Sequence, residues 1–131
     1  MSVFVDSNVP MYLIGKPHPR RDDVELALRR LTLGGTRLVT SAGVFQELLH
    51  RYAGLSRLDL VQVAFDTLRG LVDDVLDVTL ADVDLARDVV RSYPLSARDA
   101  LHVSVMRRHR VSRILSLDRA FDAVPGIERI G

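Results

Sequence analysis

The first ten residues, Met1-Ser2-Val3-Phe4-Val5-Asp6-Ser7-Asn8-Val9-Pro10, predict a buried strand that leads directly into a helix. Residues 2–5 are mostly apolar, which is typical of a strand covered on both faces of a parallel sheet. Asp6 follows this strand, and Pro10 is tolerated in the first turn of the next helix. Ligands bind where the strands of an open parallel sheet end, so Asp6 is the first candidate functional residue.

The same alternation of strand and helix continues to the end of the chain. Further strands are expected at residues 37–40, 75–80, 113–117 and 127–130, and helices at 22–33, between Ser41 and Gly54, at 56–72, at 81–92 and from Ser96 onward. In the helix at 81–92, an inward face is expected to carry Val83, Ala86, Val89 and Val90. Strands that alternate with helices favour an α/β fold, a sandwich of helices around a parallel sheet.

The composition is that of a globular protein. The chain has 131 residues, of which 47% are hydrophobic and 27% charged, so residues 1–131 are expected to form one domain. No apolar run reaches the length of a membrane span and no signal-peptide pattern precedes the first strand, so no membrane association and a cytoplasmic location are expected. The absence of cysteine excludes disulfides, thiolate metal sites and a cysteine nucleophile.

Charge gives only local indications. The net charge is +1, which argues against a global basic field for nucleic acid. Arginine, whose planar fork suits phosphate, supplies all the basic residues except Lys16. Basic residues cluster at residues 107–113 and again at Lys16, His18, Arg20 and Arg21; such clusters are phosphate sites or simply solvated helix ends.

Four acidic residues lie at separate points where a strand is expected to end or a helix to begin. They are Asp6, Glu47, Asp99 and Asp118. Gathered at one edge of the sheet, four carboxylates would repel one another unless a hard divalent cation neutralised them. Taken singly, each has an ordinary explanation: Asp6, Asp99 and Asp118 suit helix caps, and Glu47 suits an exposed pair with Arg51.

Two other kinds of acidic site fit the sequence less well. A receiver-type phosphoacceptor domain needs a lysine late in the chain, whereas the only lysine is Lys16. A haloacid-dehalogenase-type phosphatase needs a second aspartate two residues after the first, and here that position is Asn8.

Four segments in order carry a more specific resemblance. They are Val5-Asp6-Ser7-Asn8-Val9, Ser41 through Glu47-Leu48, Ala97-Arg98-Asp99-Ala100-Leu101-His102, and Leu115-Ser116-Leu117-Asp118-Arg119-Ala120-Phe121-Asp122. Together they resemble a PIN-domain protein, and closely a VapC-type toxin ribonuclease, over nearly the whole chain. The resemblance implies a three-layer α/β/α sandwich with a mainly parallel sheet of four to five strands. It further implies RNA cleavage that depends on Mg²⁺, with Mn²⁺ as a substitute, and a VapB-like antitoxin partner.

The resemblance also assigns roles to residues. Asp6, Glu47, Asp99 and Asp118 match the acidic positions of the family, Asp122 matches a further acid, and Pro10 departs from its usual aliphatic residue. Asp6 and Asp99 are expected to bind the metal directly and Asp118 directly or through water, while Glu47 completes the shell or orients the attacking water. Two neighbouring sets complete the expected site: Ser7, Asn8 and Ser116 as hydrogen-bond partners of the carboxylates, and Arg98, His102 and Arg119 as contacts to the RNA backbone.

Two points remain open at this level. The same residues also suit a catalytically silent PIN-fold module that binds RNA or protein, or a purely structural α/β domain with scattered caps. The segment 56–72 carries more apolar residues than one buried stripe needs; it is either a well-buried helix or, as the resemblance implies, the site of a homodimer or antitoxin groove. With 5% aromatic residues, base stacking is expected to be minor.

Overall fold

A five-stranded parallel sheet forms the centre of the molecule in the computed structural model, which describes residues 1–131. The strand order is β3-β2-β1-β4-β5, and every neighbouring pair is parallel. The strands are β1 (Ser2–Val5), β2 (Arg37–Ser41), β3 (Asp74–Leu76), β4 (Arg113–Leu115) and β5 (Glu128–Ile130). The α/β fold with a parallel sheet of four to five strands is therefore confirmed.

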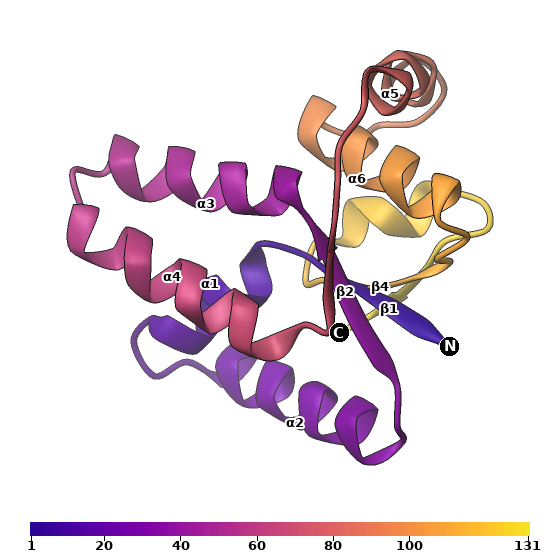
Figure 1. The fold of residues 1–131 in the computed structure, drawn as a ribbon. Coiled ribbons are helices and arrows are strands. Elements are labelled where there is room, and N and C mark those ends of the chain that lie inside the picture. The colour runs from indigo at the N-terminus through magenta and orange to yellow at the C-terminus, as the bar shows by residue number, and fades with distance from the viewer.

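The helices form two layers, one on each side of the sheet (Figure 1). From β1 the chain moves outward to β2 and β3 in one direction, then returns past β1 to β4 and β5 in the other. Because crossovers between parallel strands are right-handed, this reversal sends the two sets of helices to opposite faces. One set is α1 (Asn8–Ile14), α2 (Pro19–Leu33), α3 (Ala42–Gly54) and α4 (Leu58–Leu71); the other is α5 (Leu80–Ser92), α6 (Ala97–Arg108) and the short 3₁₀ helix η1 (Arg119–Ala123).

The reversal of strand order lies between β1 and β4, in the middle of the sheet. β1 pairs with β2 on one side and with β4 on the other, with Val5 opposite Leu115. The chain leaves β1 and β4 toward opposite faces, which opens a crevice beyond their carboxyl ends. Asp6 follows β1 and Asp118 follows β4, so the topology brings these two acids to the same crevice.

The core fills the space between the sheet and both helical layers. Val3, Phe4 and Val5 of β1 are completely buried, as expected for the central strand of a sheet covered on both faces. Helix α6 is also buried on most of its surface, with Ala100, His102, Val103, Ser104, Val105 and Met106 all at 1% exposure or less. The helix that carries Asp99 is therefore held rigidly over the sheet. None of the helices combines the length and the apolar character that crossing a membrane requires.

Arg108 connects the end of α6 to the start of α5 through two ion pairs. The Arg108 guanidinium donates to Asp82 at 2.8 Å and to the Asp77 carboxylate at 2.8 Å. Asp82 is buried and also completes a capping box with Thr79 at the start of α5. Burial alone would raise the pKa of Asp82, but the hydrogen bonds from Arg108 and Thr79 hold that pKa below its ordinary value. Arg108 thus serves the fold, and this part of the basic cluster at residues 107–113 is not a free phosphate site.

Several element boundaries differ from the sequence expectation. The strand expected at 75–80 is only β3, Asp74–Leu76, because its partner β2 ends at Ser41 and leaves no ladder for later residues. Helix α2 begins at Pro19 rather than at 22, because proline suits the first helical turn and the His18 ring accepts a hydrogen bond from the Arg20 N–H. Ser41 precedes α3 as expected, but its hydroxyl makes no capping hydrogen bond.

The exposed apolar side chains also differ in part from the expectation. In α5, Ala86 and Val89 face inward, but Val83 and Val90 are 50% and 42% exposed, so that part of the prediction is wrong. Helix α5 packs on α6 at the outside of the sandwich. Contact with a single helix buries a narrower stripe of α5 than contact with a sheet would. In α4, Ala64 and Leu68 are buried whereas Leu58 and Val63 lie in solvent, which leaves an apolar surface on this helix.

The packing of α3 gives a stability prediction with a control in the next residue. Leu48 is completely buried and Leu49 is 46% exposed. We expect Leu48→Ala to lower the free energy of unfolding by about 3 kcal/mol, because it leaves a cavity in the core. Leu49→Ala should cost less than about 1 kcal/mol. Urea unfolding followed by circular dichroism measures both, and equal losses would contradict this packing of α3.

Candidate active site

The four predicted acids line one cavity of about 330 Å³ at the crevice beyond β1 and β4. Asp6 comes from the end of β1, Glu47 from α3, Asp99 from the first turn of α6 and Asp118 from the turn after β4. Ser7, Asn8 and Arg98 line the same cavity. The reversal of strand order thus brings together, in one cavity, residues that span 113 positions of the sequence, from 6 to 118.

Asp6 is held in the floor of this cavity by three hydrogen bonds. The Ser116 hydroxyl donates to its carboxylate at 2.6 Å, the Ser7 N–H at 2.7 Å and the Asn8 amide at 3.4 Å. Asn8 also accepts from the Leu117 N–H, so it ties the turn after β1 to the turn after β4. These contacts agree with the expectation that small polar neighbours orient the acids. Burial raises the pKa of Asp6 above its ordinary value despite these bonds and the nearby His102.

Glu47 is buried at the cavity, which excludes the alternative explanation of an exposed helix residue paired with Arg51. Its two carboxylate oxygens have separate partners: the His102 ring nitrogen at 2.7 Å and the Ser7 hydroxyl at 2.5 Å. Burial alone would raise the pKa of Glu47, but the hydrogen bond and charge of His102, together with Ser7, lower it below the ordinary value. Glu47 is therefore an oriented, ionised group rather than half of a surface ion pair.

His102 lies beneath the acids and does not reach the surface. It is 1% exposed, packs against Phe4 with ring centroids 5.5 Å apart, and has its Nε2 atom 3.8 Å from the Asp6 carboxylate. Burial alone would lower the pKa of His102, but the bond to Glu47 and the negative charges of Asp6 and Glu47 raise it. The expected contact of His102 with an RNA backbone is wrong, because no ligand can touch so deeply buried a ring.

The sequence contained a signal for this role of His102. It stands one turn after Asp99, in a helix whose flanking residues Ala100, Val103 and Val105 are all apolar. A polar ring within such a stretch must find a polar partner in the interior, since an unpaired buried group is costly. What the sequence did not contain was the identity of that partner, which comes from α3.

Asp99 and Asp118 both reach the cavity, but only Asp118 also caps a helix. Asp99 is the third residue of α6; the cap of this helix is Ser96, whose hydroxyl accepts from the Asp99 N–H at 3.2 Å. The Asp118 carboxylate accepts from the Ala120 N–H at 2.9 Å and so caps η1. Burial, the negative charge of Asp6 and hydrogen bonding with Asp118 raise the pKa of Asp99 to about 7. Capping and site membership, which the sequence left as alternatives, therefore coexist at Asp118, whereas the Asp99 carboxylate is left for the site.

The donor set fits a hard divalent cation. Asp6 and Asp99 both have raised pKa values, so without a cation part of their charge must be neutralised by protons. Atoms of Asp6, Glu47 and His102 also lie within 4.8 Å of one another. His102 and Glu47 already bind each other, however, which leaves the carboxylates at the cavity surface as the better ligands. Oxygen donors are those that Mg²⁺ and Mn²⁺ prefer.

The remaining predicted residues lie at or outside the rim. Arg98 is exposed, lines the cavity, and its charge lowers the pKa of Glu47. Arg119 is exposed at the start of η1 beside Asp118. Asp122 is not brought to the cavity, because Arg129 holds it in a two-point ion pair at 2.9 and 3.3 Å. The structure thus gathers the four acids and leaves the accessory acid outside.

Fold and site together define a class: a doubly wound α/β protein with a carboxylate cluster at its switch point. The PIN-domain family model matches residues 3–127. Ribonuclease VapC13 of Mycobacterium tuberculosis is 49% identical over 129 residues, which cover 98% of each chain. The chain therefore belongs to the PIN-domain family and is of the VapC type, which confirms the resemblance seen in its sequence.

Solved structures agree on the fold. The structure of VapBC2 from Rickettsia felis, bound to a DNA fragment from its promoter, matches with a TM-score of 0.76 and 16% identity, covering 99% of this chain and 98% of that one. The structure of Mycobacterium tuberculosis VapC20, described as a toxin that cleaves the sarcin-ricin loop, matches with a TM-score of 0.76 and 21% identity, covering 96% and 97%. The three-layer PIN arrangement expected from the sequence is thereby confirmed.

The raised pKa of Asp99 predicts how stability depends on pH. An aspartate titrates near about 3.9 when unfolded, so between that value and about 7 the folded state binds more protons. The contribution of Asp99 to stability is therefore fully present below about pH 4 and is lost as pH rises to about 7. The metal-free protein should weaken over this range, and Asp99→Asn should flatten the decline. Urea unfolding in chelator, with Asp23→Asn on the exposed face of α2 as control, measures it.

The same urea unfolding is repeated with added Mg²⁺ in place of chelator. A cation stabilises the ionised carboxylates, so excess Mg²⁺ should restore stability most strongly near neutral pH. A parent protein and an Asp99→Asn variant with the same pH slope would show that Asp99 is not the titrating group.

The buried hydrogen bond of His102 gives a second prediction. His102→Leu removes the donor to a buried carboxylate and should lower the free energy of unfolding by about 2 kcal/mol. His102→Gln, which keeps an N–H donor, should recover part of the loss. Ser104→Ala on the same helix should be nearly neutral, because the buried Ser104 hydroxyl has no hydrogen-bond partner. Thermal unfolding of the three variants tests the assignment, and a fully stable His102→Leu protein would refute it.

Proposed function

We propose that this protein is a divalent-metal-dependent endoribonuclease, the toxin of a pair with a VapB-like antitoxin. The observation that carries the proposal is the convergence of Asp6, Glu47, Asp99 and Asp118 on one cavity. The full-length similarity to a VapC ribonuclease supports RNA as the substrate. The reaction is hydrolysis of a phosphodiester: a water oxygen bonds to phosphorus, the bond from phosphorus to one ribose oxygen breaks, and that oxygen takes up a proton.

Asp6, Asp99 and Asp118 would hold the cation, with Mg²⁺ as the physiological ion and Mn²⁺ as a substitute. When bound, the ion supplies positive charge to the phosphate and lowers the pKa of a bound water. The protein's part is to fix the carboxylates in advance. Ser116 and Asn8 orient the Asp6 carboxylate, the Ala120 N–H orients that of Asp118, and the Ser96 cap fixes the backbone of Asp99 at the start of α6.

Glu47 acts as an orienting group in this proposal. Its pKa is lowered, which makes it a weak base, and both of its oxygens already accept hydrogen bonds. A free lone pair of its fixed carboxylate can still accept a hydrogen bond from the attacking water and aim it at the phosphorus. His102 and Ser7 are positioning residues that act through Glu47.

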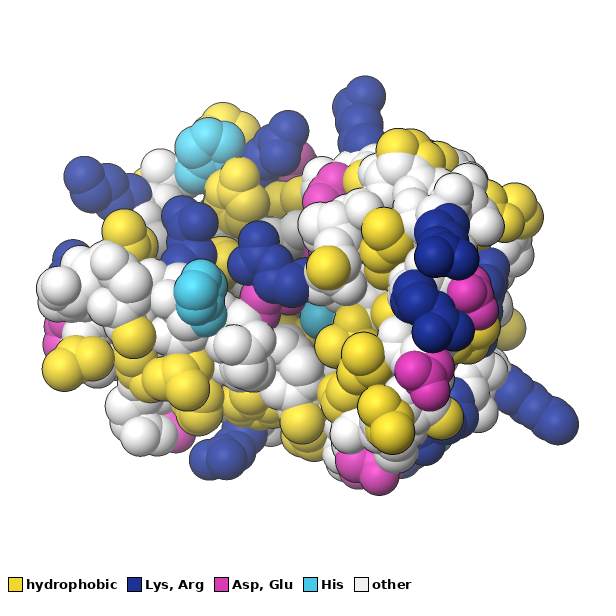
Figure 2. Space-filling model, turned by 90° about the horizontal axis from the view of Figure 1, so that it is seen from above, with side chains coloured by type: hydrophobic (Ala, Val, Ile, Leu, Met, Phe, Trp, Pro, Cys, Tyr) yellow, Lys and Arg dark blue, Asp and Glu magenta, His cyan; other side chains and the backbone are white.

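Basic side chains provide the approach for RNA. Arg98 stands at the cavity rim, and Arg119 lies beside Asp118. Figure 2 shows basic side chains beside partly covered acidic ones in the middle of the face seen from above. Cations next to an acidic cavity offset its repulsion of the phosphate backbone, so both arginines are proposed to contact phosphates.

The toxin role implies protein partners. The VapBC2 structure is that of a toxin–antitoxin pair, which supports a VapB-like antitoxin for this chain. Leu58 and Val63 leave an apolar surface on α4, and we place a homodimer or antitoxin contact there.

Cleavage of RNA by the Asp99→Asn variant tests the proposal. Purified protein is incubated with total cellular RNA in Mg²⁺, in Mn²⁺ or in chelator, and new 5′ ends are mapped. The parent should give discrete cuts in either metal and none in chelator. Asp99→Asn should reduce the rate by about 10²–10³-fold, because loss of one key electrostatic group costs that much in comparable sites. Asp122→Asn, outside the cavity, serves as the matched control.

The same experiment separates the alternative. A folded parent protein that binds RNA and cuts none of it in any metal is a silent PIN-fold binding module. Undiminished cleavage by pure, folded Asp99→Asn would remove Asp99 from the metal site. Far-UV circular dichroism of each variant establishes that the fold is intact.

A further inference from the structure

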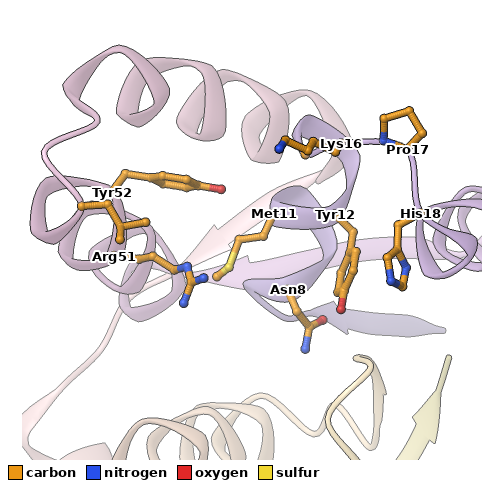
Figure 3. Close-up of a pocket in the computed structure, with 10 residues that line it drawn as sticks. Asn8, Met11, Tyr12, Lys16, Pro17, His18, Arg51 and Tyr52 are labelled. Carbon is orange, nitrogen blue, oxygen red and sulfur yellow. The ribbon is translucent and has the colours of Figure 1, made fainter.

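A second cavity, of about 630 Å³, opens beside the active site between α1 and the C-terminal half of α3 (Figure 3). Asn8 lines both cavities, so the two spaces adjoin at this residue. In Figure 3 Asn8 lies at one end of this groove, and Lys16 and Tyr52 lie farther along it. A polymer that runs through the acidic cavity and past Asn8 therefore enters this groove next.

The charge of this groove is opposite to that of its neighbour. No acidic residue lines it, whereas Lys16, His18 and Arg51 do. Neither Lys16 nor Arg51 forms an ion pair within the protein, although seven other basic side chains do so with aspartate or glutamate, namely Arg21, Arg37, Arg57, Arg87, Arg108, Arg113 and Arg129. Two basic side chains without acidic partners, next to a cavity proposed to bind phosphodiesters, would attract the anionic backbone of a nucleic acid.

The wall between these cations is aromatic and apolar. Two of the chain's three tyrosines, Tyr12 and Tyr52, line it together with Met11. The Tyr12 and His18 rings pack together with centroids 5.7 Å apart and planes tilted by 49°. Figure 3 shows the hydroxyl end of Tyr52 and the nitrogen of Lys16 directed into the space. A flat apolar wall flanked by cations suits a ligand with a planar base and a charged backbone.

We infer that this groove is a nucleotide subsite, which holds an unpaired base next to the scissile phosphate of a single-stranded RNA. The inference rests on the proposed ribonuclease function. Tyr12, with His18 behind it, offers the stacking surface, and Lys16 and Arg51 contact the flanking phosphates. The acids of the catalytic cavity repel a phosphate backbone, so the substrate needs its attraction from groups just outside, and this groove provides them without any acid of its own.

The proposed subsite would give base stacking a larger part than the aromatic content of the whole chain predicts. The low aromatic content is an average over the chain, whereas the groove concentrates two of the few aromatic side chains at the site. An unpaired base fits because a duplex keeps its bases stacked inside, out of reach of Tyr12. The groove therefore selects single-stranded loops or ends.

RNA binding tests the subsite apart from cleavage. The full-length protein carrying Asp99→Asn is titrated with a fluorescein-labelled, random-sequence single-stranded RNA containing 4-thiouridine, with a duplex RNA as comparison, at several salt concentrations. Adding Tyr12→Leu should weaken binding roughly tenfold at every salt concentration, because one stacking contact is lost. Adding Lys16→Gln and Arg51→Gln should weaken it and reduce the salt slope by about 1 per lost phosphate contact. Arg29→Gln, on the exposed side of α2, removes a charge elsewhere and should change nothing.

Ultraviolet crosslinking of the same RNA to the protein without groove substitutions gives a second readout that does not depend on how variants fold. Crosslinks at Tyr12, His18 or Tyr52 support the subsite. Crosslinks confined to other surfaces, or groove variants that bind RNA as the Arg29→Gln control does, overturn it. Variants that weaken only binding of the antitoxin would make the groove a protein site and likewise overturn it. If the parent cuts RNA in these cases, the proposed function stands and the subsite alone fails; if it neither binds nor cuts RNA, both fail.

Discussion

The hydrogen bond between His102 and Glu47 joins the two helical layers beyond the ends of β1 and β4, where no strand lies between them. His102 belongs to α6 and Glu47 to α3, which lie on opposite faces of the sheet. The bond is 2.7 Å long and both side chains are largely shielded from solvent. Together they form the floor of the crevice beyond β1 and β4. The bond also fixes the carboxylate that faces the cavity. Stability and site geometry therefore depend on the same contact, since loss of the His102 partner of this buried carboxylate would cost about 2 kcal/mol.

The acids of the site fall into two electrostatic groups. Glu47 has satisfied oxygens and a lowered pKa, so it keeps its charge at all physiological pH values. Asp99, crowded by Asp6 and Asp118, has a pKa of about 7 and holds a proton part of the time without a cation. Neighbouring carboxylates whose environments separate their pKa values have different tasks. In the proposed reaction Glu47 would be a fixed, charged hydrogen-bond acceptor, and Asp99 would be the carboxylate for which a proton and the cation compete.

The sequence was a good guide to what local patterns determine and a poor one to what tertiary contacts determine. Asp6 and Asp118 follow strands, and the parallel sheet alone places them at one edge, so they could be predicted together. The burial of Glu47 could not, because it depends on His102 from another helix; for His102 the apolar neighbours indicated burial but not its partner. The strand β3 was predicted but made too long for the same reason: its length is set by where β2 ends and not by its own apolar residues.

Two adjoining cavities of opposite charge impose a direction on any polyanion that binds across them. If the proposed function holds, the acidic cavity would attract a phosphate only with a cation bound, whereas Lys16 and Arg51 in the groove would attract the backbone at all times. Binding in the groove could then precede loading of the catalytic cavity, and it would place the next phosphate beside Asn8, which also orients Asp6. Because Asn8 lines both cavities, a change at that residue would affect the proposed recognition and the proposed catalysis together.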